Sequence, residues 1–436
     1  MKKLVSYVLA LLLVFTCTNI IANDFGEKDP ASYNATLTFL VQSTGQPNYM
    51  INEFNKVYPN IKIELIEVPA AELQEKIITT AMSGVDVPDM FACRTQFVKA
   101  LVNAGDRIYL DFKSLGDVSE WTKDIERYVV DVGTDSNGAL RSIAWQCPVG
   151  GVYYRRSLAK EYFDTDDPTE IAKLFANTDE ILKTAETLKQ KSGGKVKLFA
   201  DAVQDIQYLL LTNAGGFLKD NVLNTGDGIK EIYELSRTFY DNEYCHKIRN
   251  DSNAINAAIL ADEVFAYCLP TWGLNYNIMP NFPEMEGDWA VCEGPYPFVG
   301  GGSWFGISSQ SDNVEEAYVF IKYVLSDPDF QISYASNFGD YTSNKVTHAI
   351  ISAMDEEEAA VFAPFRYLGG QNAYAYWTSQ LEKGVNSAAF SPYDEYFTSY
   401  LMSSVVSYAT GLLSLEEAIE TFKFDCKSYA PDISVQ

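Results

Sequence analysis

Strand-like and helix-like patterns alternate near the start of the chain, and this alternation constrains the possible folds more than any other feature of the sequence. Short apolar stretches alternate with segments whose apolar residues recur every three or four positions. Such an order predicts a mostly parallel β-sheet with helices on both faces, and a ligand site beyond the carboxyl ends of its strands. The predicted elements are, in order, the strand 36–41, helix 49–58, strand 61–68, helix 70–83, strand 88–93 and helix 95–104.

A second α/β unit is predicted from about residue 147 onward, because 436 residues exceed what one hydrophobic core usually serves. The segment 295–308 contains three consecutive glycines, which let a backbone turn sharply. This segment either forms an ordinary loop or carries the chain back to the first unit. The tail, 355–436, is predicted to be almost entirely helical. The second unit is predicted to contain the helices 178–191, 206–213 and 228–242 and the strands 196–200 and 264–269.

The first residues have the pattern of an export signal. Two lysines precede an apolar run, residues 4–15, that is too short to cross a bilayer comfortably. Two processing sites fit: cleavage after Ala22, with residues 1–22 as the signal peptide, or lipidation of Cys17 after removal of residues 1–16. Both place the mature chain in the periplasm or on the extracellular face, and the second anchors it to the membrane.

The composition argues against several partners and chemistries. A net charge of −26 argues against nucleic acid or an anionic membrane surface as a partner. The two histidines, His246 and His348, lack metal-ligand spacing, and no nucleophile or nucleotide-binding motif occurs, so we expect no metal, no cofactor and no enzyme. Six cysteines besides Cys17 permit disulfides without fixing their pairing.

Several landmark segments occur in a characteristic order. They are the N-terminal signal, 36–39, 61–68, 83–91, 138–154, 264–272, 300–309 with 314–325, and 411–418. In this order they resemble the extracellular solute-binding proteins of bacterial ABC importers, most closely the maltose-binding-protein-like sugar-binding family 1. The resemblance covers nearly the whole mature chain, and it rests on order and spacing rather than on any single motif.

The resemblance implies an α/β, two-lobed periplasmic-binding-protein fold of type II, in which each lobe is a mostly parallel sheet flanked by helices and the C-terminal region is helical. Lobe 1 would comprise residues 25–146 and 300–333, and lobe 2 residues 147–299 and 334–436. A mono- or oligosaccharide would bind between the lobes, and a hinge motion would close them. The transmembrane subunits of an ABC permease would recognise the closed form. We expect the protein to be a monomer.

Sugar recognition needs flat apolar faces against pyranose C–H groups and planar polar side chains for hydroxyls. The resemblance places such residues in the first β–α loop, after the third strand, at the end of the strand 264–269 and just after the glycines. The candidate ligand-binding residues are Gln42, Ser43, Gln46, Arg94, Gln96, Tyr153, Tyr154, Trp272, Ser303, Trp304, Tyr396 and Phe397, together with Arg366 and Trp377, which have no match in the family and belong to cleft or core.

Three details qualify this site. Alternation along a strand points only one of Tyr153 and Tyr154 towards the cleft. Cys93 stands where the family often has an aromatic residue. The alternative functions are the same fold with a non-sugar solute, namely a peptide, a polyamine or a glycerophosphoester, and a secreted carbohydrate-active enzyme with a catalytic pair of carboxylates.

Overall fold

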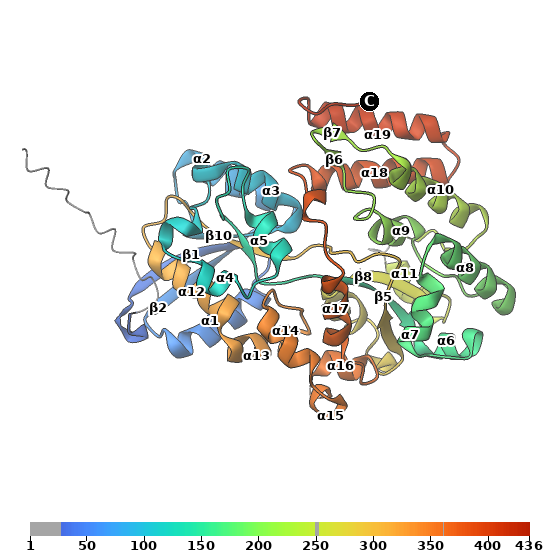
Figure 1. Cartoon of the computed structure of the whole chain (residues 1–436), viewed down its shortest axis with the longest axis horizontal. Coiled ribbons are helices and arrows are strands. Elements are labelled where there is room, and N and C mark those ends of the chain that lie inside the picture. The colour runs from blue at the N-terminus through green and yellow to red at the C-terminus, as the bar shows by residue number, and fades with distance from the viewer. Residues whose placement is uncertain (1–27, 249–252, 361) are drawn as a thin grey trace, which may run out of the picture.

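The computed structural model describes residues 28–248, 253–360 and 362–436, in which two lobes lie side by side (Figure 1). The first lobe contains a five-stranded sheet in the order β2 (Ile61–Glu67), β1 (Ala35–Val41), β3 (Met90–Arg94), β10 (Ser303–Ile307) and β4 (Ile143–Ala144). β1 pairs in parallel with β2 and β3, as the alternating pattern predicts. β10 comes from much later in the chain and runs antiparallel to β3 and β4.

The second lobe contains a three-stranded sheet in the order β8 (Ala266–Pro270), β5 (Gly150–Arg155) and β9 (Trp289–Cys292). Both pairings are antiparallel, so the prediction of a mostly parallel sheet is wrong for this lobe. The reason is the path of the chain: β5 follows the strand β4 of the first sheet, and β9 precedes β10 of that sheet, so neighbouring strands that enter and leave the lobe run in opposite directions. The predicted strand 196–200 forms only isolated parallel bridges, at Lys197 and Phe199.

Three extended segments lie side by side between the lobes. The backbone N–H of Cys147 donates to the carbonyl of Tyr341 at 2.7 Å, and that of Gly300 donates to the carbonyl of Pro148 at 3.0 Å. Isolated bridges join Gln146 to Thr342 and Val149 to Val299. The segment around 146–150 is therefore bonded on one side to the segment after α13 and on the other to the glycine segment.

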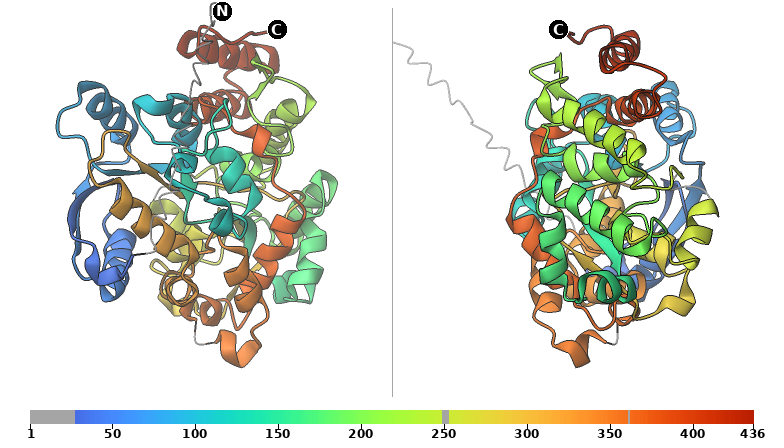
Figure 2. Two further views of the ribbon diagram at one scale, coloured as in Figure 1. Left: turned by 60° about the vertical axis from the view of Figure 1, so that its left-hand side comes forward. Right: turned by 90° about the vertical axis from the view of Figure 1, so that its right-hand side faces the viewer.

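Helices cover the sheets and form the C-terminal region, with α18 and α19 stacked at one end of the molecule (Figures 1 and 2). The first-lobe sheet is accompanied by α1 (Gly45–Val57), α2 (Leu73–Ser83), α3 (Thr95–Asn103), α4 (Ser119–Thr122), α5 (Arg127–Gly133), α12 (Val314–Ser326) and α13 (Pro328–Phe338). The second lobe contains α6 (Arg156–Phe163), α7 (Pro168–Ala172), α8 (Thr178–Ser192), α9 (Ala202–Leu210), α10 (Asp227–Asp241), α11 (Asn253–Leu260) and the two-stranded sheet β6 (Leu218–Lys219) with β7 (Val222–Leu223). The tail comprises α14 (Lys345–Ser352), α15 (Glu356–Ala359), α16 (Ala363–Tyr367), α17 (Ala373–Glu382), α18 (Asp394–Ala409) and α19 (Leu415–Tyr429).

The sequence specifies these helices through caps and apolar spacing, as α8 illustrates. The side chain of Asn177 accepts a hydrogen bond from the backbone N–H of Glu180, and the helix ends at Gly193 with a φ of 63°. Ile181, Ala185 and Leu188 are buried on one face of this helix.

Two hydrophobic clusters form the core. One contains the first-lobe residues Leu37, Phe39 and Phe305 and extends to α17, and the other contains second-lobe residues such as Phe199 and Phe265. The six cysteines of the described part are buried free thiols, Cys93, Cys147, Cys245, Cys268, Cys292 and Cys426. Packing, not cross-linking, therefore holds this part of the chain together.

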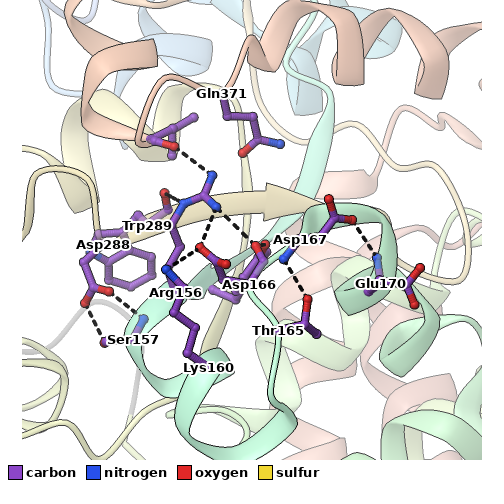
Figure 3. Close-up of polar contacts among 12 residues, drawn as sticks. Arg156, Ser157, Lys160, Thr165, Asp166, Asp167, Glu170, Asp288, Trp289 and Gln371 are labelled. Atoms are coloured by element: carbon purple, nitrogen blue, oxygen red, sulfur yellow. Dashed lines mark hydrogen bonds and ion pairs between the residues drawn. The ribbon is translucent and has the colours of Figure 1, made fainter.

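The guanidinium of Arg156 ties the start of α6 to β9 and to the segment that follows α16 (Figure 3). It donates to the carbonyl of Trp289 at 3.2 Å, to the carbonyl of Leu368 at 3.1 Å and to the carboxylate of Asp166 at 3.1 Å. Nearby, the amide of Gln371 bonds both backbone groups of Val291, and so it occupies the edge of this short sheet.

The predicted export signal and Cys17 lie outside the described residues. Within the described ranges, none of the helices combines the length and the apolar character that a membrane crossing requires.

Candidate ligand-binding cleft

Two cavities lie between the lobes and meet at Gly301, which lines both. The larger has a volume of about 490 Å³ and lies at the carboxyl ends of β1 and β3. It is lined by Val41, Gln42, Ser43, Gln46, Pro47, Ala70, Ala92, Arg94, Trp145, Gln146, Trp272, Tyr276, Gly301, Gly302 and Ser303. The smaller has a volume of about 200 Å³ and lies between α3, α9 and α18.

The ends of neighbouring parallel strands supply the first polar side chains of the larger cavity. Gln42 and Ser43 follow β1, and Arg94 is the last residue of β3. The guanidinium of Arg94 makes no hydrogen bond or ion pair with any described residue, and the buried Oε1 of Gln42 has no hydrogen-bond partner there. The cavity therefore presents a fork of N–H donors and a buried acceptor that a ligand can satisfy.

Aromatic rings from the second lobe form the opposite side of the cavity. Trp272 follows β8, and its indole N–H donates to the carbonyl of Gly300 at 2.8 Å, so the ring is fixed against the glycine segment. A Cβ at Gly301 would lie 2.9 Å from the indole nitrogen, and its φ is 77°, so only glycine fits there without strain. Tyr276 lines the same cavity and is 56% exposed, which leaves its ring accessible.

A buried carboxylate lies behind two of the cavity amides. The Oδ2 atom of Asp340 accepts hydrogen bonds from Nε2 of Gln46 at 2.6 Å, from Nε2 of Gln146 and from the hydroxyl of Tyr334 at 2.9 Å. Burial raises the pKa of Asp340 to about 6, because desolvation of the carboxylate outweighs the hydrogen bonds from Gln146, Tyr334 and Gln46, which lower it. The carboxyl group therefore titrates near neutral pH.

The smaller cavity has a more apolar lining with polar side chains at its edge. Tyr208 and Phe298 stack with their ring centroids 5.3 Å apart, and both line it. The polar side chains are Thr95, Gln96, Gln204, Gln207, Thr212, Asp394 and Thr398, and burial raises the pKa of Asp394 to about 7. This cavity shares the lining residue Gly301 with the larger one, so the two lie next to each other.

The structure brings seven of the predicted ligand-binding residues to these cavities. Gln42, Ser43, Gln46, Arg94, Trp272 and Ser303 line the larger cavity, and Gln96 lines the smaller one. They come from the end of β3, from the segments that follow β1, β3 and β8, including the first turns of α1 and α3, and from the start of β10 after the glycines, which are the positions that the resemblance indicated.

Four predicted aromatic residues lie in the core and line neither cavity. Tyr153 and Tyr154 alternate into different core clusters, and both are fully buried because both faces of β5 are covered. Trp304 is 1% exposed, and its indole N–H donates to the hydroxyl of Thr95 at 2.8 Å beneath the cavity. Phe397 is fully buried in the second-lobe cluster.

Three more candidates also lie away from both cavities. Tyr396 stacks on Tyr429, with ring centroids 4.1 Å apart, on the outside of α18 and α19. Arg366 forms a surface ion pair in which its Nε lies 3.0 Å from Oε1 of Glu286. Trp377 is fully buried in the core. These residues are therefore omitted from the site proposed below.

Several residues of the cavity were not among the ligand-binding residues predicted from the sequence. Trp145 and Gln146 lie at the start of the first interlobe segment, close to the predicted lobe boundary at residue 146, and Tyr276 lies in the helical turn after Trp272. Asp340 reaches the site through tertiary contacts alone, since it follows α13 with no motif around it. The only signal available was its position shortly after residue 334, where the resemblance returns the chain to lobe 2.

The fold and the site define a two-lobed binding protein, and the comparisons agree. Residues 49–360 match the family model described as bacterial extracellular solute-binding protein, so the chain belongs to this family. None of the curated proteins searched matches the chain. The matched residues include four of the five strands of the first sheet, with β1 outside the match, all three strands of the second sheet and most of the larger cavity.

Solved structures of solute-binding proteins, among them sugar-binding proteins, share the fold. An extracellular solute-binding protein of family 1 is 18% identical, with a TM-score of 0.75 and coverage of 90% of this chain and 99% of that chain. The galacto-N-biose-/lacto-N-biose I-binding protein of Bifidobacterium longum, in complex with lacto-N-biose, is 14% identical, with a TM-score of 0.70 and coverage of 92% and 99%. The sugar-binding protein MalE of Xanthomonas citri is 15% identical, with a TM-score of 0.70 and coverage of 90% and 96%. The predicted two-lobed type II fold is thereby confirmed.

Proposed function

We propose that this solute-binding protein captures a carbohydrate, a mono- or oligosaccharide, between its lobes as the substrate-binding component of an ABC import system. One observation carries the proposal: accessible aromatic rings and unpartnered hydrogen-bonding groups converge in a single interlobe cavity. Trp272 and Tyr276 offer apolar faces to pyranose C–H groups, Arg94 offers donors, and Gln42 offers a buried acceptor.

The charges of the larger cavity favour a neutral, hydroxyl-rich solute over the other ligand classes. Among the described residues that line this cavity, Arg94 alone is charged. A polyamine would need carboxylates in the lining to pair with its ammonium groups, and the lining offers none in the described chain. A glycerophosphoester would use Arg94 but would leave the aromatic rings without a role, and a peptide would need a row of backbone partners.

Ligand capture would proceed by hinge closure about the three interlobe segments. The proposed lobes are 25–146 with 300–333 and 147–299 with 334–436, so that Arg94 and Gln42 close on Trp272 across the cleft. The closed form, a monomer, would then deliver the sugar to the transmembrane permease subunits. We propose that the protein works outside the cytoplasm after export, free or anchored through Cys17, and that it is not an enzyme.

A thermal-shift screen tests the ligand class. Neutral mono- and oligosaccharides, spermidine, a short peptide mixture and glycerol 3-phosphate derivatives are added separately at millimolar concentration. A ligand that binds only the native state stabilises it by RT ln(1 + [L]/Kd), so we expect a rise in Tm with at least one sugar and with none of the other classes.

A matched pair of variants links the shift to the cavity. Trp272→Ala removes the ring that lines the larger cavity, and Tyr396→Ala removes an aromatic residue that stacks on Tyr429 away from both cavities. The shift should disappear or shrink strongly in the first variant and persist in the second. A shift with an amine, a peptide or a phosphoester and none with any sugar would contradict the carbohydrate assignment.

A further inference from the structure

We infer that Asp340 is a positioning residue for ligand binding, which holds the amides of Gln46 and Gln146 in the larger cavity from the point where the three interlobe segments meet. The inference rests on the proposed function, because it assigns a role in binding to a residue that lines neither cavity. The inference also predicts how the stability of the ligand-free protein depends on pH. That dependence can be measured without a sugar.

The contacts of one carboxylate oxygen carry the argument. Oδ2 of Asp340 accepts from Nε2 of Gln46 and Nε2 of Gln146, and both of these side chains line the cavity. The hydroxyl of Tyr334 on α13 donates to the same atom at 2.9 Å. Two amides and a phenol are therefore oriented by a single acceptor that is itself only 1% exposed.

The same residue joins the three segments between the lobes. The Oε1 atom of Gln146 accepts from the backbone N–H of Ser303 at 3.2 Å, which connects the first segment to the glycine segment. The backbone carbonyl of Asp340 accepts from the hydroxyl of Tyr374, which connects the third segment to α17. A change at Asp340 therefore acts on the hinge and on the cavity amides together.

The surroundings of the Asp340 carboxyl group do not compensate its negative charge. Its Oδ1 atom is buried without a hydrogen-bond partner among the described residues. The other titratable groups near it are the phenols Tyr153, Tyr276, Tyr334 and Tyr374, and no lysine or arginine contributes to the pKa of Asp340 in this part of the chain. With no cation to retain the charge, the group takes up a proton at about pH 6.

Protonation weakens the positioning. Hydrogen bonds to an ionised acceptor are roughly twice as strong as those to a neutral one. When Asp340 is a carboxylate, both cavity amides are held with an N–H towards Oδ2, and their remaining groups keep one orientation. When it is protonated, this preference weakens, and the free protein populates the binding-competent arrangement less often.

The test measures sugar affinity as a function of pH in Asp340→Asn, with the sugar that gives the largest rise in Tm. Asparagine keeps the size and one acceptor oxygen but does not titrate. If only the ionised form is competent, wild-type Kd rises about tenfold between about pH 7.5 and pH 5, because roughly one molecule in ten is ionised at pH 5. Asp340→Asn should bind more weakly than wild type at pH 7.5 and should lack the tenfold rise in Kd near pH 6; any contribution from Asp394 in the smaller cavity is shared by both proteins.

Asp89→Asn is the control for loss of a buried carboxylate. Asp89 bonds Thr38 and Ser311 and lines neither cavity, so its variant should keep the wild-type pH profile. A wild-type Kd that does not change with pH, or an Asp340→Asn variant that keeps the wild-type profile, would overturn the inference.

A readout without ligand separates this inference from the proposed function. Wild type should lose stability relative to Asp340→Asn as pH rises towards 6, whether or not a sugar binds. If every sugar fails in the screen while this difference appears, the carbohydrate assignment is wrong and the buried, titrating carboxyl group remains. If a sugar binds and the difference is absent, the role of Asp340 is refuted and the proposed function stands.

Discussion

The pH dependence of unfolding in Asp340→Asn is the prediction that the structure quantifies most fully. Burial raises the pKa of Asp340 from 3.8 to about 6, and the side chain is 1% exposed, so little solvent screens the effect. The folded state therefore binds this proton more tightly than the unfolded state does. Its stabilising contribution is complete below about pH 3.8 and is lost as the pH rises through about 6.

The magnitude follows from the shift. Roughly two pKa units at about 1.4 kcal/mol each amount to about 3 kcal/mol over the whole window. About 2 kcal/mol of this falls between about pH 4.5 and pH 7.5, where the protein can be handled. Asparagine carries no charge at either pH, so the difference in the free energy of unfolding between the variant and wild type should grow by that amount in favour of the variant.

Urea unfolding of both proteins at several pH values measures this difference directly. The comparison cancels the titration of the other acidic groups, because both proteins share them. A difference that stays constant within about 0.5 kcal/mol from pH 4.5 to 7.5 would refute the assignment of Asp340 as a buried, uncompensated carboxyl group.

Further predictions concern single side chains. Arg94→Met should weaken sugar binding while leaving Tm nearly unchanged, because the guanidinium has no partner among the described residues; calorimetric titration and a melting curve check both parts. Gly301→Ala should cost about 1–3 kcal/mol in urea unfolding and also reduce affinity, since the φ of 77° is strained for alanine and its Cβ would crowd Trp272. Trp304→Phe should cost about 1 kcal/mol through the lost bond to Thr95 and retain the wild-type Kd.

Local patterns were enough to predict the first lobe. The alternation of strands and helices predicted β1, β2 and β3 with their parallel direction, and of the two alternatives for the glycine segment the return to the first unit is the one that the structure shows, as β10. The strand direction predicted for the second sheet was wrong, because its strands pair antiparallel. A short buried strand shows no sign of whether its neighbour runs parallel or antiparallel, since that depends on where the chain enters and leaves the lobe.

The candidate site, too, could be predicted from the sequence only in part. Residues that directly follow a strand, such as Gln42 and Trp272, could be predicted because the fold brings strand ends together. Aromatic residues within strands and helices could not be assigned, because the same ring serves a core or a cleft equally well; Trp304 and Phe397 belong to the core. Asp340 was missed because its partners, Gln46 and Gln146, are distant in sequence.

Calorimetric titration of wild type, Trp272→Ala and Tyr396→Ala with the best sugar from the screen decides whether the interlobe cavity is a sugar site. We expect saturable binding at a single site in wild type and in Tyr396→Ala, and at least about a tenfold rise in Kd in Trp272→Ala, which corresponds to about 1.4 kcal/mol. Equal affinity in all three proteins, or the absence of binding heat with every sugar, would contradict a carbohydrate site between the lobes.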